Sequence, residues 1–148
     1  MKEFKEFMPY LNKCGIVSDA LIRRVEYLYG MFLEICPDEI EDIFVTDYFT
    51  ESQTREYESL WFFSSAYCME AKQFVTQNKL DITPIKKRII YFQIEVHDYD
   101  FKGATQASRA NLNVLFGAAL QANFKSASQN CDSLMNIVKK YIKPNLQM

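Results

Sequence analysis

From residue 38 onward, apolar side chains recur at every second position in short runs that polar turns separate. Alternation with a period of two is the pattern of a β-strand with one buried and one wetter face. Consecutive strands joined by such short turns are typical of an antiparallel meander. The pattern predicts seven strands, over residues 43–49, 57–64, 67–75, 80–83, 90–97, 112–116 and 120–125.

After the last strand the period changes, and one C-terminal helix is predicted from residue 128 to residue 142. Ser128 suits its N-cap, and Pro144 is expected to end it. A meander of this size leaves one apolar face open, so we expect the helix to close a sheet or a strongly bent barrel. Its apolar stripe falls at i, i+3, i+4, i+7 and i+8 and consists of Leu134, Ile137, Val138, Tyr141 and Ile142.

The first 37 residues have a helical period, which divides the chain into an N-terminal helical segment (1–37) and residues 38–148. A short helix is expected over 3–12, and a longer one, capped by Ser18, is expected to end near Ile35. The apolar face of this segment must lie either on the rest of the chain or on a second copy, so a homodimer through these helices is one prediction. The predicted fold class is α+β: a mainly antiparallel seven-stranded barrel or sandwich, preceded by one or two helices and capped by a C-terminal helix.

The order of seven strands followed by a capping helix resembles the pleckstrin-homology (PH) superfold, and more narrowly the PH-like domains of bacterial proteins. Two stretches carry the resemblance, SLWFFSSAYCMEAKQFV (59–75) and LDITPIKKRIIYFQIEV (80–96). The second stretch has the order that is typical of the family: a short strand, a bend and a long strand. The resemblance covers about residues 39–143 and implies a PH-like barrel of the kind that binds other molecules; the helical segment 1–37 lies outside it.

The charge pattern bears on which ligands this domain binds. Family members that bind inositol phosphates do so with lysine and arginine side chains around the first hairpin. Residues 38–58 instead carry eight acidic side chains against one basic, Arg55. We therefore expect neither phosphoinositide nor nucleic-acid binding. No run approaches the roughly 18 apolar residues of a membrane span, and the first residues contain no apolar leader, which predicts a cytoplasmic protein.

Few side chains of the sequence are candidates for catalysis. His97 is the only histidine, and its neighbour Asp98 points to the opposite face of the strand, so the two do not form a catalytic pair. The four cysteines show no CxxC spacing, which argues against a zinc site and favours free core thiols. Glycines form no phosphate-binding loop. We expect no enzyme activity and no cofactor or metal.

The prediction is a non-catalytic protein-interaction or scaffold domain that binds an unknown protein or peptide. On the strand 90–97, Ile90, Phe92, Ile94 and Val96 are expected to be buried, which leaves the other face for a partner. The alternative is a small-molecule-binding or catalytic α+β domain of the cone-shaped NTF2-like kind, for which a polar pocket containing His97 would argue. The candidate protein-binding residues are Tyr91, Gln93, His97, Tyr99, Asn111 and Asn113.

Overall fold

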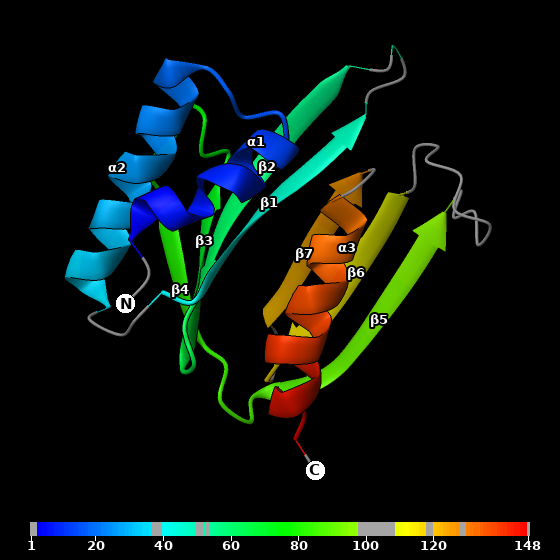
Figure 1. The fold of residues 1–148 in the computed structure, drawn as a ribbon. Coiled ribbons are helices and arrows are strands. Elements are labelled where there is room, and N and C mark those ends of the chain that lie inside the picture. Colours follow the sequence, from blue (N-terminus) through cyan, green and yellow to red (C-terminus); the bar gives the residue numbers. More distant parts are fainter. Residues whose placement is uncertain are drawn as a thin grey trace.

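The computed structural model of the chain describes residues 3–36, 40–49, 52, 54–97, 109–117, 120–127 and 130–147. It is an α+β fold in which helices precede and follow the strands (Figure 1). The N-terminal segment contains the 3-10 turn η1 (Phe4–Phe7) and the helices α1 (Met8–Lys13) and α2 (Asp19–Ile35). The described strands are β1 (Asp42–Phe49), β2 (Arg55–Phe63), β3 (Tyr67–Lys72), β4 (Leu80–Pro84), β5 (Ile89–His97), β6 (Arg109–Phe116) and β7 (Leu120–Ala127). The chain then continues into α3 (Asn130–Ile137), the π-helical turn η2 (Val138–Ile142) and the 3-10 turn η3 (Lys143–Asn145).

The strands form two antiparallel sheets and not one closed barrel. Sheet A has the order β1-β2-β3-β4, and sheet B has the order β5-β6-β7. The predicted seven strands and their antiparallel pairing are confirmed, whereas a single closed barrel is not what the strands form. The break falls after β4, where Pro84 has no N–H to continue a ladder. The next N–H, that of Ile85, donates to the carbonyl oxygen of Ala66 at 3.0 Å, and the chain then passes to sheet B.

The C-terminal helix packs into the space between the two sheets, where it contacts β7, β6 and β1 (Figure 1). The predicted stripe is confirmed, because all five of its residues are buried. The predicted N-cap, Ser128, lies outside the described residues. The α-helical geometry ends at Ile137, earlier than predicted, and continues as the π turn η2. Pro144 lies in the first turn of η3, where its missing N–H needs no partner.

The N-terminal helices cover the other face of sheet A (Figure 1). Ser18 caps α2 as predicted, since the Leu21 N–H donates to its Oγ at 3.3 Å. The apolar stripe of α2 is buried within the same chain, against the sheet side chains that point away from α3. The contacting residues are Val25, Leu28, Tyr29 and Phe32 of α2 and Ile43, Val45, Leu60, Phe62, Met69 and Ala71 of sheet A.

The helix stripe provides a direct stability test. Ile137 is 4% exposed and belongs to the core cluster between the sheets. We expect Ile137→Ala to lower the free energy of unfolding by about 2–5 kcal/mol, because the substitution leaves a cavity under the helix. Urea denaturation measures this difference. A loss under about 0.5 kcal/mol, which is typical of surface positions, would show that the helix is peripheral to the core.

Candidate functional site

The strand β5 lies at an open edge of sheet B. Only β6 pairs along its length, and in Figure 1 it lies at the outer side of the sheet, beyond α3. At its start, Leu146 forms a parallel bridge with Ile89, and the Gln147 N–H donates to the Ile89 carbonyl oxygen at 2.8 Å. Within the described part of the chain, no strand pairs with this edge over residues 90–96. An open edge of this kind presents backbone donors and acceptors to which an extended peptide can add.

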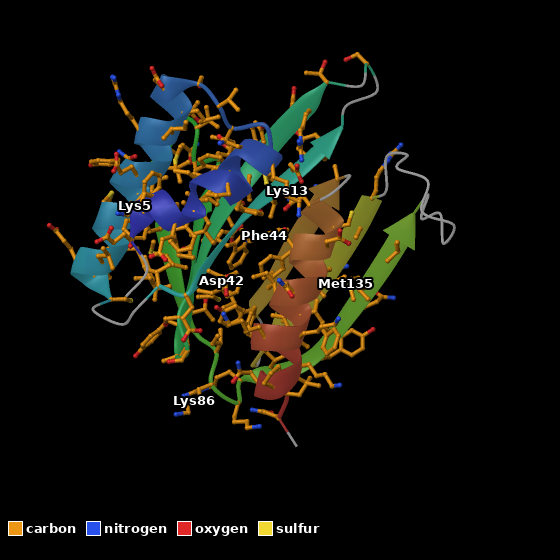
Figure 2. The ribbon with its side chains drawn as sticks, viewed as in Figure 1. Lys5, Lys13, Asp42, Phe44, Lys86 and Met135 are labelled. Atoms are coloured by element: carbon orange, nitrogen blue, oxygen red, sulfur yellow. The ribbon has the colours of Figure 1, made fainter. Side chains whose placement is uncertain are left out.

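Phe92 and Ile94 of β5 pack against the core between the sheets, whereas Ile90 and Val96 are exposed; we name these four residues the β5 strip. Ile90 and Val96 are 45% and 46% exposed, so the prediction that both are buried is wrong. One reason is that α3 packs mainly on β7, β6 and β1 and does not reach across β5. The other is a register shift between Ile89 and Tyr91, which leaves Ile90 without a partner on β6. Met135 of α3, 38% exposed, lies on the flank of the helix nearer β5 in the view of Figure 2.

The opposite side of sheet B brings four of the six predicted residues together. Tyr91 is 55% exposed and lies across from Leu115, while Gln93 lies directly across from Asn113. Asn111 is the next residue of β6 on this face. For His97 the structure describes only the backbone, which pairs with Arg109; Tyr99 lies outside the described residues.

The asparagines of this outer face bond to a residue that the sequence reasoning missed. Asn123 of β7 donates through its Nδ2 to the Oδ1 of Asn111 at 2.5 Å and to the Oδ1 of Asn113 at 2.7 Å. The amide side chains therefore hold one another in place beside Tyr91 and Gln93. A signal for this cluster is present in the sequence, because Asn123 lies in an alternating run and takes the outward position of that run.

A buried carboxylate, Asp47 of β1, is a second polar feature that the sequence reasoning missed. Asp47 is fully buried, and its Oδ2 accepts from the Arg55 Nε at 2.7 Å. Its Oδ1 accepts from the Asn130 Nδ2 at 2.8 Å and from the Ala127 N–H at 3.1 Å. The Tyr10 hydroxyl in turn donates to the Asn130 Oδ1 at 2.8 Å. The carboxylate thus links both sheets, the start of α3 and the N-terminal segment.

Desolvation dominates the electrostatics of this cluster. Burial raises the pKa of the Asp47 carboxyl above its ordinary value, and the hydrogen bonds from Asn130 and Arg55 oppose the rise. Burial also raises the pKa of the Tyr10 hydroxyl. Both carboxylate oxygens of Asp47 accept hydrogen bonds from the protein itself, so the arrangement holds elements together. Its signal in the sequence was a carboxylate within a run of apolar strand residues, between Val45 and Phe49.

Three hollows of moderate volume indent the described surface. One of about 270 Å³ lies between the N-terminal segment, β1 and α3, and another of about 180 Å³ lies beside Asp47 and Lys125. The third, of about 300 Å³, lies between the β3–β4 side of sheet A and the ends of β6 and β7. None of the three has His97 among its described lining residues.

All four cysteines are free and buried, as the sequence predicts. Burial raises the pKa of Cys14 to about 11 and that of Cys68 further, which keeps these thiols protonated and unreactive. No group of three or more His, Cys, Asp or Glu side chains in the described ranges could hold a metal ion. Among the described helices, none is both long and apolar enough to cross a bilayer.

Comparison of the chain with models of protein families, with curated proteins and with solved structures found no significant match. The functional argument therefore depends on the geometry of the molecule.

Proposed function

We propose that this chain is a non-catalytic PH-like interaction domain that binds an extended peptide along the open edge of β5. The resemblance depends on an order of seven antiparallel strands followed by a C-terminal helix; the chain has this order, which supports the PH-like part of the proposal, although the strands form two sheets and not one closed barrel. The observation that supports the binding function is a strand edge along which no described strand pairs over residues 90–96, flanked by two chemically different surfaces.

A peptide added beside β5 would place its alternate side chains on the two faces of sheet B. Those on the core-facing side would cover the β5 strip, where Ile90 and Val96 are each nearly half exposed. Those on the outer side would meet Tyr91, Gln93 and the asparagine cluster. This combination of main-chain bonding, apolar burial and amide contacts favours a peptide with apolar residues at every second position and polar residues between them.

The structure also gives a reason to set phosphoinositides aside as the ligand. The acidic region 38–58 contains Arg55 as its only basic residue. Its guanidinium forms an ion pair with the Asp47 carboxylate, with Nη2 and Oδ2 separated by 2.5 Å. A cation that is already neutralised within the protein contributes little to binding a phosphate.

Selection of peptides from a random phage-displayed library on the full chain tests the proposal. We expect selected peptides to alternate apolar and polar residues and to shift the backbone amide resonances of residues 90–96. Val96→Lys should weaken the binding of a selected peptide by at least about tenfold, because a charge replaces apolar surface that the peptide covers.

Val75→Lys is the matched control, because Val75 is 48% exposed and Val96 is 46% exposed. Val75 follows β3 of sheet A, whereas β5 belongs to sheet B. This control should bind the selected peptide as the unaltered chain does. A library that yields no specific peptide, or peptides that bind the Val96→Lys variant at full affinity, would overturn the proposed edge site.

A further inference from the structure

Most of the β5 edge lacks the features that usually protect an exposed strand. Residues 90–96 contain no proline, lysine or arginine, and Glu95 is the only charged residue among them. A register shift and the bridge from Leu146 protect only the start of the strand. Natural proteins protect open edges with charges, proline or a covering segment, because an exposed edge pairs readily with another chain. We therefore expect a further strand to cover this edge.

We propose that β5 pairs with the β5 of a second copy, in an antiparallel dimer that builds on the proposed function because it uses the same edge. The two three-stranded sheets B would join into one continuous sheet. A two-fold axis perpendicular to that sheet places both α3 helices on the same face. Met135, which is 38% exposed on the flank of α3 nearer β5 (Figure 2), would then lie beside the joint. The second copy covers the edge until a peptide displaces it.

The chain leaves one register for this pairing. Opposed residues of an antiparallel ladder point to the same face of the sheet, so the axis must pass through a residue and not between two. Residues 146–147 already occupy the edge beside Ile89. An axis at Gln93 would place residue 97 of the second copy in that same position. An axis at Glu95 would place two carboxylates directly opposite each other, which destabilises a sheet.

An axis at Ile94 meets both conditions and matches the side chains of the two strands. Phe92 then lies across from Val96 of the second copy, and Ile94 lies across from itself, so apolar residues meet apolar residues. On the outer face, Gln93 lies across from Glu95 of the second copy, whose carboxylate can accept from the Gln93 amide. Each of these heterotypic contacts occurs twice by symmetry. This complementarity within a single strand favours a second copy of the chain as the partner.

Sedimentation equilibrium of the full chain, without peptide, tests the dimer from micromolar concentration to about 1 mM. We expect a concentration-dependent equilibrium between monomer and dimer. Val96→Lys places a charge across from Phe92 and should weaken dimerisation at least about tenfold, whereas Val75→Lys should leave it unchanged. A chain that stays monomeric over this range, or a Val96→Lys variant that dimerises at full affinity, would overturn the proposal.

A pair of variants at Gln93 tests the register. Gln93→Lys places a cation across from Glu95, and Gln93→Glu places a like charge there. The lysine variant should dimerise at least about tenfold more tightly than the glutamate variant, and added salt should reduce this difference. Gln121→Lys and Gln121→Glu make the same changes in net charge at an exposed position of β7, and these two controls should dimerise equally. Equal affinities of the two Gln93 variants would reject this interface.

The dimer and the peptide function can fail separately, because sedimentation is measured without peptide. If selected peptides bind but no dimer forms, the dimer is wrong and the proposed function stands. If the dimer forms with the expected dependence on Gln93 but the library yields no peptide, the proposed function is wrong and the dimer stands. A selected peptide at saturating concentration should convert the dimer to monomer, and a dimer that persists with the peptide bound would show that it uses another surface.

Discussion

Replacing Arg55 with methionine is expected to lower the free energy of unfolding by about 3–5 kcal/mol at neutral pH. The substitution removes the cation beside Asp47, whose carboxylate is fully buried and receives both an ion pair and a hydrogen bond from Arg55. A buried charge without its partner is far more costly than the intact pair is favourable. Urea denaturation of the variant and of the unaltered chain measures the difference.

The effect should depend on pH, with a sign that follows from the raised pKa of Asp47. The folded state holds the Asp47 proton more tightly than the unfolded state, so its contribution to stability is fully present below the unfolded pKa. That contribution is lost as the pH rises through the folded pKa. Without Arg55 the folded pKa rises further, so the cost of the substitution should shrink as the pH falls from 7 toward about 5.

Two outcomes would contradict this account of the Asp47 cluster. One is a loss of unfolding free energy below about 1 kcal/mol for Arg55→Met at neutral pH, which would indicate that the carboxylate is in contact with water. The other is a loss of unfolding free energy that is the same at pH 7 and at about pH 5. The double variant Asp47→Asn with Arg55→Met is the control: it carries no buried charge and should recover part of the loss.

Phe124→Ala is expected to lower the free energy of unfolding by about 3–5 kcal/mol as well, through packing instead of charge. Phe124 is fully buried on β7 and lies at the centre of an aromatic cluster between the two sheets. Its ring centroid lies 4.2 Å from that of Trp61, 6.1 Å from that of Phe44 and 6.2 Å from that of Phe63. Removing it leaves a cavity that three rings from sheet A cannot fill without moving.

Denaturation followed by Trp61 fluorescence measures this effect, and the emission of the folded variant should shift to longer wavelength as water approaches the indole. Tyr91→Ala is the control, since Tyr91 is 55% exposed and its loss should change stability by no more than about 0.5 kcal/mol. If the two substitutions cost the same, the two sheets do not pack through Phe124.

The candidate peptide site was predicted in part. Alternation placed Tyr91, Gln93, Asn111 and Asn113 on the outer face of the sheet, and the structure brings these four together. Alternation could not show that the other face of β5 is also accessible, because that depends on how far α3 extends across sheet B.

Local patterns in the sequence predicted the strands and helices of this protein. A period of two marked the seven strands, a period of 3.6 marked the terminal helix, and the Ser18 cap marked the start of α2, because each of these depends on side chains within a few residues of one another. The division of the strands into sheets of four and three, and a β5 edge to which no described strand adds, could be seen only in the three-dimensional structure. The same holds for the contact between Asp47 of β1 and Asn130 of α3 in the interior. These features depend on contacts between distant segments, and the periodicity of one segment carries no information about which other segment covers it.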